Sequence, residues 1–259
     1  MLLVVGAGLF GSQAAAYARS KGCRALVFDP GLAGAASPAA AGLFKEEWAG
    51  KKGREHYQLA LPLLDELYGI RRVELTHDDG SKQPYLCVPP TSILEREPIR
   101  QKVTAVGDGW LMAGGRRYEG WVYIAAGVWS GAFIPSLKVE GRAGSSFLFQ
   151  DEQEGRLRYI ARGRQAIAFV REPGTTYFSD GTAEREYTGE HERLSLERAA
   201  GFGLSECPVL RYHGYRPYTP GGPLFEKIGN RTWLATGGRK MGTILGAAFA
   251  RRLIEKELR

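Results

Sequence analysis

The stretch LLVVGAGLFG, residues 2–11, predicts a β-strand, a tight glycine turn and the start of an α-helix. Gly6 makes the turn, Gly8 lets the backbone approach a pyrophosphate, and Gly11 lets the helix pack closely on the strand. The free N–H groups and the positive dipole end of this helix then face the phosphates. The stretch therefore predicts a dinucleotide-binding site.

A second predicted strand, residues 24–28, ends at Asp29. This is the position where an acidic side chain binds the ribose hydroxyls of an adenosine. A G-x-G-x-x-G motif alone is a weak signal, but here a strand precedes it, a helix follows it and an acid ends the next strand. This segment does not decide whether the dinucleotide is NAD or FAD.

Composition limits the remaining possibilities. The chain has 259 residues, enough for one large domain or two small ones, and 35 Lys and Arg against 28 Asp and Glu give a net charge of +7. This excess is compatible with a polyanionic partner, but the charges are spread along the chain, as in a soluble basic enzyme.

The three cysteines and four histidines show no metal-ligand spacing, so we expect free thiols and no metal site. The first twenty residues lack the basic start of a secretory signal and no run could span a bilayer, so we expect a cytoplasmic protein without a membrane partner.

The order of the predicted elements indicates an α/β fold. A loop of small residues, 31–43, precedes a helix from about Arg54 to Tyr68, in which Pro62 is a candidate for a kink or a break. Strand-rich segments follow, and the last of them leads into the turn Gly237-Gly238 and a helix from Thr243 onward. The predicted strands and the helix between them are 71–90 (several short strands), 103–106, 109–112, 121–127, 145–149, 165–171, helix 190–201, and 232–236.

Four stretches of the chain resemble the D-amino-acid-oxidase-like flavoproteins, the family that contains glycine oxidase and sarcosine oxidase. Residues 1–29 are similar to the FAD fingerprint, and SPAAAGL, 37–43, resembles the loop that runs along the flavin. YIAAGVWS, 123–130, is similar to a strand that ends in an Ala-Gly-x-Trp-Ser turn. GYRPYTP, 214–220, followed by GGRKMG, 237–242, resembles the closing signature of the family. Together these stretches cover about half of the chain.

The resemblance implies a Rossmann-like FAD-binding domain and a reduced antiparallel β-sheet substrate domain. The FAD-binding domain is expected to be discontinuous, over 1–70, 101–136 and 212–259, and the substrate domain to take 71–100 and 137–211. Members of the family are usually longer, and the missing length falls in the substrate domain. No cysteine stands next to Arg216 for covalent flavin attachment, so the implied FAD is noncovalent.

Carried over position by position, the resemblance also implies an FAD site. Backbone N–H groups near Gly238 and Gly242 are expected at the flavin C2 carbonyl, where negative charge develops on reduction, and Lys240 either adds a charge there or is solvated. The implied FAD-binding residues are Gly6, Gly8, Leu9, Phe10, Gly11, Asp29, Ser37, Ala40, Ala41, Gly42, Ala126, Gly127, Trp129, Gly238, Lys240, Met241, Gly242 and Thr243.

The implied chemistry is oxidation of an amine, in which flavin N5 takes a hydride from the carbon next to nitrogen and the resulting imine is hydrolysed. The protein then has to hold the substrate, and an arginine matches a carboxylate bidentately. Arg216 stands at the position that binds the substrate carboxylate in glycine-oxidase relatives, and Arg239 is a second candidate. The alternative for each is a surface salt bridge. His213 is expected to be structural.

Two kinds of substrate fit this implied activity. One is a free small amino acid such as glycine, sarcosine or a D-amino acid. The other is a glycine unit attached to a modified base of tRNA or phage DNA, which needs an open pocket and a basic rim. The reduced substrate domain and the net charge of +7 favour the second slightly. A noncatalytic FAD- or nucleic-acid-binding protein is a further alternative, although such a protein has no use for Arg216 and Arg239.

Overall fold

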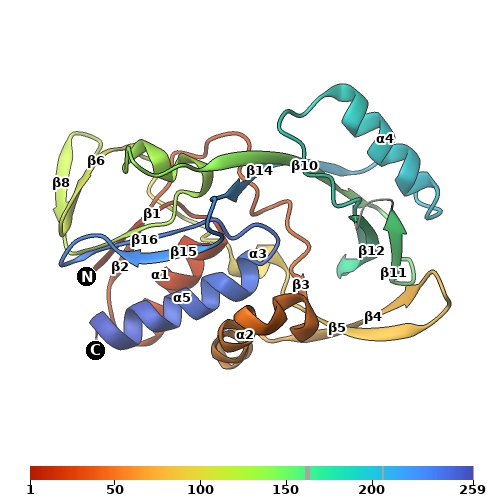
Figure 1. Ribbon diagram of the computed structural model, residues 1–259, viewed down its shortest axis with the longest axis horizontal. Helices are drawn as coiled ribbons and strands as arrows, with labels where there is room; N and C mark the ends of the chain where they lie inside the picture. Colours follow the sequence, from red (N-terminus) through yellow and green to blue (C-terminus); the bar gives the residue numbers. More distant parts are fainter. Residues whose placement is uncertain (161–163, 206, 259) are drawn as a thin grey trace.

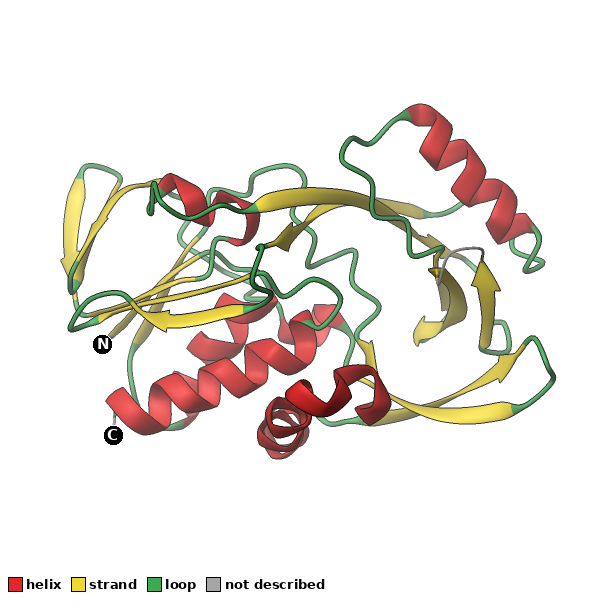
Figure 2. Ribbon diagram, viewed as in Figure 1, coloured by secondary structure: helices red, strands yellow, loops and turns green. Residues whose placement is uncertain are grey.

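The computed structural model describes residues 1–160, 164–205 and 207–258. Its elements form two connected parts, a parallel sheet covered on both faces and a large curved sheet beside it (Figures 1 and 2). The chain crosses between the two parts several times, and both termini lie in the first part. A pocket therefore forms where the two parts meet, as described below.

The first part is a five-stranded sheet in the order β15-β16-β9-β1-β2, in which only β15 runs antiparallel to its neighbour. All four residues of its interior strand β1 are buried, as expected for a parallel strand covered on both faces. The predicted strand and crossover pattern at both chain ends is confirmed. The strands are β1 (Leu2–Val5), β2 (Ala25–Phe28), β9 (Trp121–Ile124), β15 (Leu224–Lys227) and β16 (Thr232–Thr236).

Helices α1 (Leu9–Ser20) and α5 (Gly242–Glu257) cover one face of this sheet, and α2 (Glu46–Tyr68) packs against α5. Apolar side chains fill the layer, and Phe10 meets Phe249 edge to face with ring centroids 5.5 Å apart. The glycine turn has the predicted properties. Gly6 has φ +104°, and a Cβ on Gly11 would lie 2.8 Å from Cγ1 of Val4 and overlap the carbonyl oxygen of Gly6.

A three-stranded antiparallel meander covers the opposite face. It consists of β6 (Val103–Gly107), β7 (Trp110–Ala113) and β8 (Arg116–Glu119), and its first two strands confirm those predicted at 103–106 and 109–112. Leu111 of the meander is buried in one core with Leu3 and Ile124 of the parallel sheet. This layer completes the burial of the nucleotide-type sheet.

The second part is an eight-stranded sheet in the order β14-β10-β13-β12-β11-β4-β5-β3. Every neighbouring pair is antiparallel except β11 with β4, which is parallel. Helix α4 (Gly189–Ala200) packs near β13, and α3 (Pro90–Ile93) and a short 3₁₀-helix η1 (Gly127–Ala132) lie in connections. The strands are β3 (Leu43–Phe44), β4 (Arg71–His77), β5 (Lys82–Cys87), β10 (Glu140–Phe149), β11 (Arg156–Ile160), β12 (Arg164–Glu172), β13 (Thr175–Ser179) and β14 (Leu210–Tyr218).

Two expectations need correction or refinement. Helix α2 begins at Glu46 rather than near Arg54, and its non-helical backbone is at Gly50, with φ +62°, rather than at Pro62. Glycine adopts this φ at little cost, so the break falls there, whereas Pro62 is tolerated inside the helix.

Strand β14 pairs along its whole length with β10 of the large sheet, although its residues from 212 onward were assigned to the FAD-binding domain. The division into domains stays a prediction.

Candidate functional site

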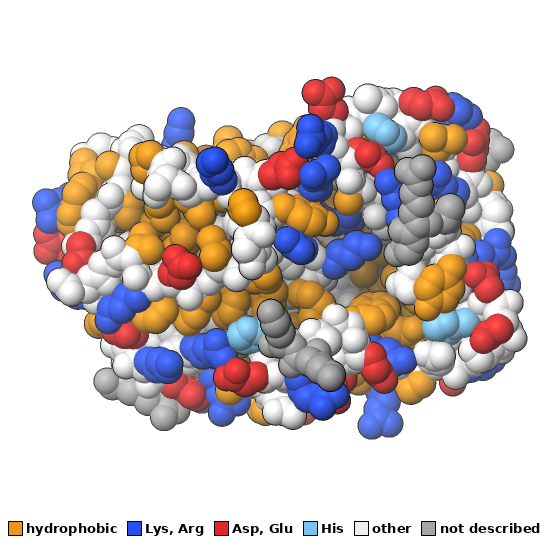
Figure 3. Space-filling view, viewed as in Figure 1, with side chains coloured by type: hydrophobic (Ala, Val, Ile, Leu, Met, Phe, Trp, Pro, Cys, Tyr) orange, Lys and Arg blue, Asp and Glu red, His pale blue; other side chains and the backbone are white. Residues whose placement is uncertain are grey.

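A cavity of about 1090 Å³ lies between the two parts of the molecule. On one side it is lined by residues at the carboxyl ends of β1, β2, β9 and β16, the edge at which open parallel sheets bind ligands. On the other side it is lined by residues of β12, β13 and β14. In the space-filling view a hollow opens in this face, and Lys and Arg side chains lie beside it (Figure 3).

One end of the cavity has the geometry of a dinucleotide site. The N-terminus of α1 opens onto it, with neither a side-chain cap on Gly8 nor an acidic residue in the first turn. The helix therefore presents a positive dipole end to the cavity. Asp29 ends β2 in the cavity wall, and its carboxylate accepts hydrogen bonds from the N–H of Ala7 at 2.7 Å and of Gly31 at 2.7 Å. These bonds hold the carboxylate in place beside the glycine turn.

The loop at residues 35–43 forms a long wall of the cavity. Ser37 ties its first part to α1, because Oγ of Ser37 accepts a 3.0 Å hydrogen bond from the N–H of Leu9. The large sheet holds the next part. The hydroxyls of Ser146 and Tyr177 both donate to the carbonyl of Ala39, at 3.0 and 2.8 Å. The loop is thus fixed from both parts of the molecule.

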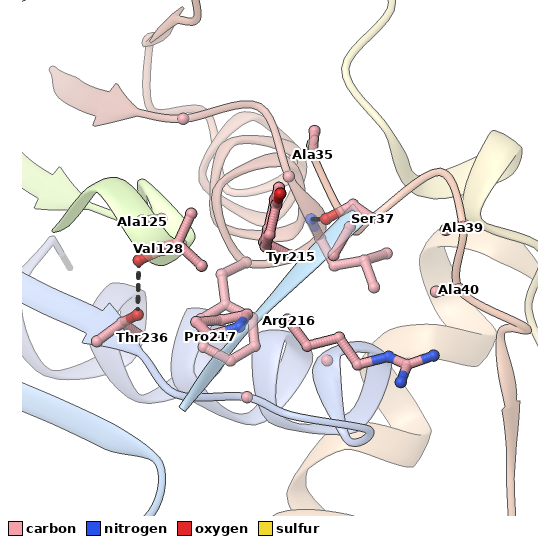
Figure 4. Close-up of a pocket in the computed structure, with 18 of the residues that line it drawn as sticks. Ala35, Ser37, Ala39, Ala40, Ala125, Val128, Tyr215, Arg216, Pro217 and Thr236 are labelled. Atoms are coloured by element: carbon pink, nitrogen blue, oxygen red, sulfur yellow. Dashed lines mark hydrogen bonds between the residues drawn. The ribbon is translucent and has the colours of Figure 1, made fainter. Parts of the chain in front are cut away.

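The turn between β16 and α5 forms another wall. Oγ1 of Thr236 donates to the carbonyl of Gly127 at 2.9 Å, which links the turn to η1 (Figure 4). The N–H of Met241 donates to the carbonyl of Gly238 at 2.8 Å, and α5 begins at Gly242. The helix N-terminus therefore points toward the cavity. Arg239, in this turn, has φ +47°, a backbone strain of the kind that clusters at functional sites.

Arg216 and Lys240 bring two positive charges to the same segment of chain. Nη1 of Arg216 donates to the carbonyl of Thr182 at 2.7 Å, and Nζ of Lys240 lies 3.6 Å from the position that a Cβ on Gly181 would take. Figure 4 shows the Arg216 side chain extended, with its guanidinium group reaching away from β14. Burial, together with the charges of Arg216 and Arg164, lowers the pKa of Lys240, while Asp180 opposes the shift. This region therefore favours an anionic ligand.

Arg239 lies in the cavity wall but is held differently. Its guanidinium carbon is 5.0 Å from the ring centroid of Tyr218, and Nη2 donates to the carbonyl of Thr219 at 3.3 Å. These contacts fix the side chain against β14. The two basic neighbours in the turn thus differ, because Arg239 is held against Tyr218 whereas the charge of Arg216 acts on Lys240.

Solved structures with the same architecture are similar to the chain over almost its full length. Iminodiacetate oxidase from Chelativorans sp. BNC1 superposes with a TM-score of 0.71 at 15% identity, covering 98% of this chain and 94% of that one. Glycine oxidase from Bacillus cereus ATCC 14579 gives a TM-score of 0.69 at 14% identity, with 98% and 96% covered. An FAD-dependent oxidoreductase from Pseudomonas aeruginosa gives 0.69 at 13%, with 100% and 91% covered.

The chain has the fold of the FAD-dependent amino acid oxidases. The resemblance and the fold class expected from the sequence are confirmed at this level. No protein-family model and no curated protein sequence matches the chain. At identities of 12–16% the solved structures establish the fold alone.

The structure brings almost all of the expected site residues of this oxidase fold into the one cavity. Gly11 is outside its lining, because this residue packs against Gly6 and Val4 beneath the turn. His213 also lies outside the lining, against the ring of Tyr187 and 3.7 Å from Glu192. The residues in the lining are Gly6, Gly8, Leu9, Phe10, Asp29, Ser37, Ala40, Ala41, Gly42, Ala126, Gly127, Trp129, Arg216, Gly238, Arg239, Lys240, Met241, Gly242 and Thr243.

Sequence reasoning missed the wall that the large sheet contributes. Gln165 and Ile167 of β12 line the cavity, as do Tyr177 and Ser179 of β13. In each strand the two positions are separated by one residue, so the alternation of side chains along a strand places them on one face. This period-2 pattern was the available signal, but it does not reveal which face meets the cavity.

The side chains and helices of the described residues also bear on metal binding and on membrane spanning. Within residues 1–160, 164–205 and 207–258, no three His, Cys, Asp or Glu side chains gather in a way that could hold a metal ion. In the same part of the chain, no helix is both long and apolar enough to cross a membrane. Cys23, Cys87 and Cys207 are free thiols.

Proposed function

We propose that the chain is an FAD-dependent oxidoreductase that oxidises the C–N bond of an amine carrying a carboxylate. The observation that carries the proposal is the arrangement of the cavity between the two parts of the molecule. A helix N-terminus and Asp29 lie at one part of its wall, and Arg216 with Lys240 at another. A dinucleotide cofactor and an anionic substrate thus have separate groups to bind them.

The residues present fit noncovalent FAD. The open N-terminus of α1 suits a pyrophosphate, and Asp29 suits the ribose hydroxyls of the adenosine. The small residues 39–42 let the backbone lie flat against a ring system, and the N-terminus of α5 faces the cavity near Gly242. When bound, the flavin supplies the electron acceptor that converts the amine to an imine.

In this proposal Arg216 binds the substrate carboxylate through its planar fork. One arm of the guanidinium is already held by the carbonyl of Thr182 at 2.7 Å, so the group is oriented before substrate binds. Lys240 supplies the second positive charge. We favour Lys240 over Arg239 for this role because the Arg239 guanidinium is occupied by Tyr218 and Thr219.

A glycine unit attached to a nucleic-acid base is the second candidate for the substrate. Two aromatic side chains of the cavity lining are exposed, Trp48 at 37% and Tyr215 at 40%, and Tyr215 is adjacent to Arg216. Exposed aromatic rings beside positive charge are typical of sites on which bases stack. The net charge of +7 supports the same alternative.

The visible spectrum of the purified protein, recorded without oxygen, tests both candidates. Bleaching of the bound flavin by glycine, sarcosine or a D-amino acid supports a small-molecule oxidase. Bleaching only by an oligonucleotide that carries a glycinyl-aminomethyl pyrimidine supports a nucleic-acid modification enzyme. A protein that takes up no FAD at all contradicts the proposed function.

A further inference from the structure

A buried arginine of the large sheet contacts the loop that lines the cavity. Arg171 of β12 is 1% exposed, and its Nη1 donates to the carbonyl of Pro38 at 3.2 Å and to that of Ala40 at 3.1 Å. The guanidinium lies 5.0 Å from the ring centroid of Tyr177 and 5.6 Å from that of Tyr212. The charge is therefore enclosed between two rings and the back of the loop.

Three consecutive carbonyls of the loop are bound from this one side. Arg171 donates hydrogen bonds to the carbonyls of Pro38 and Ala40. The hydroxyls of Ser146 and Tyr177 donate to the carbonyl of Ala39. The described chain contains no cis peptide bond, so each N–H points away from the carbonyl of its own peptide group. In the Ala40–Ala41 peptide the carbonyl faces Arg171, and the N–H of Ala41 therefore faces the opposite way.

The N–H of Ala41 is the donor that this arrangement leaves available. Those of Ala39 and Ala40 bond to the carbonyls of Ala36 and Ser37, both at 3.2 Å. The N–H of Ala41 has no hydrogen-bond partner within the described residues, and Ala41 lines the cavity whereas Arg171 does not. A cation bound to a carbonyl polarises the peptide and strengthens its N–H as a donor.

We propose that Arg171 is a positioning residue that holds the Ala40–Ala41 peptide so that its N–H donates to the flavin. This inference rests on the proposed function, because it assigns the polarised donor to FAD. A buried guanidinium is costly to desolvate, and a buried ion pair such as that of Arg171 with Glu172, in which Nη2 and Oε1 are 3.2 Å apart, is weak evidence for stability. Stability alone therefore gives little reason for an arginine at this position, whereas orientation of the loop does.

The decisive comparison is between Arg171→Met and Arg171→Lys in the full-length protein, with Arg71→Met as the matched control. Arg71 also donates to carbonyls of β12, at 2.8 Å to Val170 and 2.7 Å to Arg171, but it makes no hydrogen bond to the loop. We expect Arg171→Met to weaken FAD binding about tenfold, which corresponds to about 1.4 kcal/mol. Arg171→Lys keeps the charge and should recover part of the loss, and Arg71→Met should leave FAD binding unchanged.

Hydrogen exchange of the FAD-free protein gives a readout that does not depend on flavin. The amides of residues 37 and 39–42 should exchange about tenfold faster in Arg171→Met than in Arg71→Met, which also loses hydrogen bonds to backbone carbonyls but none to the loop. If the wild type takes up no FAD, the proposed function fails, and with it the role of Arg171 toward flavin. Unchanged FAD affinity in Arg171→Met, or an equal loss in Arg71→Met, overturns the inference even where the wild type binds FAD. Should Arg171→Met not fold, Tyr177→Phe, which removes the hydroxyl that donates to the carbonyl of Ala39, replaces it. Unchanged FAD affinity and unchanged loop exchange in that variant count against the inference.

Discussion

The hydroxyl oxygen of Ser37 accepts a 3.0 Å hydrogen bond from the backbone N–H of Leu9, 28 positions earlier in the chain. This bond joins the loop that lines the cavity to the first turn of the helix that opens onto it. A Cβ on Gly8 would lie 2.8 Å from the same oxygen, so the close approach depends on glycine. The loop and the helix N-terminus thus form one surface.

Removing this link should weaken cofactor binding. We expect Ser37→Ala to raise the Kd for FAD about fivefold, because one hydrogen bond that orders the loop is lost at a cost of about 1 kcal/mol. Titration of the FAD-free protein by flavin fluorescence measures the effect, and Ser20→Ala, at the far end of α1, is the control. Tighter binding in Ser37→Ala would mean that the serine competes with a phosphate for the N–H of Leu9.

The glycine at position 11 should be needed for folding rather than for contact with the cofactor. In Gly11→Ala the new methyl group overlaps the Gly6 carbonyl and Val4, so we expect the free energy of unfolding to fall by about 2–3 kcal/mol. Urea denaturation followed by far-UV circular dichroism gives this number. Gly53→Ala in α2 is the control, since its nearest neighbour is the methyl of Ala49 at 3.1 Å and alanine favours a helix. Equal stability of Gly11→Ala and the wild type would contradict the packing argument.

Substrate capture should depend on Arg216. We expect Arg216→Met to lower kcat/KM about 100-fold, or about 2.7 kcal/mol, while the protein keeps its bound flavin. Stopped-flow reduction under anaerobic conditions measures the loss. Lys240→Met should also lower kcat/KM. Arg239→Met should leave kcat/KM close to the wild-type value, because the guanidinium of Arg239 is held by Tyr218 and Thr219. A larger effect in Arg239→Met than in Lys240→Met would assign the second contact to Arg239.

Binding of a simple carboxylate should depend on pH through Lys240. Burial and the charges of Arg216 and Arg164 lower the pKa of Lys240, and Asp180 opposes them. The protonated amine attracts the anion, so the affinity should fall as pH rises through a value below the ordinary lysine pKa. Acetate binding, followed by perturbation of the flavin spectrum between pH 7 and pH 10, tests this. A profile for Lys240→Met that is as steep as that of the wild type would exclude Lys240 as the titrating group.

Helix α4 should depend on the buried carboxylate of Asp180. Burial acts to raise the pKa of Asp180, but hydrogen bonds from Thr182 and Ser195 and the pairing with Arg198 outweigh it, so the pKa is lowered. The folded pKa lies below the unfolded one, so this stabilisation is complete above the unfolded pKa and lost as pH falls through the folded pKa.

Asp180→Asn should therefore lower the free energy of unfolding by about 1–3 kcal/mol at neutral pH, and less in acid. Urea denaturation at pH 7 and pH 3 measures the difference, and Asp65→Asn on α2 is a control that leaves α4 untouched. A deficit that is equal at both pH values would show that the carboxylate charge does not stabilise the fold.

Local pattern was enough to predict the parallel sheet, the meander, the C-terminal helix and the dinucleotide-type glycine turn. The turn at Gly6 and the packing at Gly11 follow from the sizes and backbone freedom of neighbouring residues, so a single segment contains the information. The start of α2 was wrong because residues 46–53 carry a weak helical pattern and a glycine break. Position in the sequence alone could not show that Gly50, rather than Pro62, interrupts the helix.

The sequence by itself predicted where the cofactor signature lies and that Arg216 and the turn at 237–242 belong to one site, and in the structure both line the same cavity. Only the tertiary structure decided that Arg239 is held against Tyr218, that the charge of Arg216 acts on Lys240, and that Arg171 reaches the loop at residues 38–40. These interactions join residues at least 20 positions apart in the case of Arg239 and Lys240, and more than 130 positions apart in the case of Arg171. They depend on the register and curvature of a sheet whose strands are distant in sequence, and no local propensity encodes them.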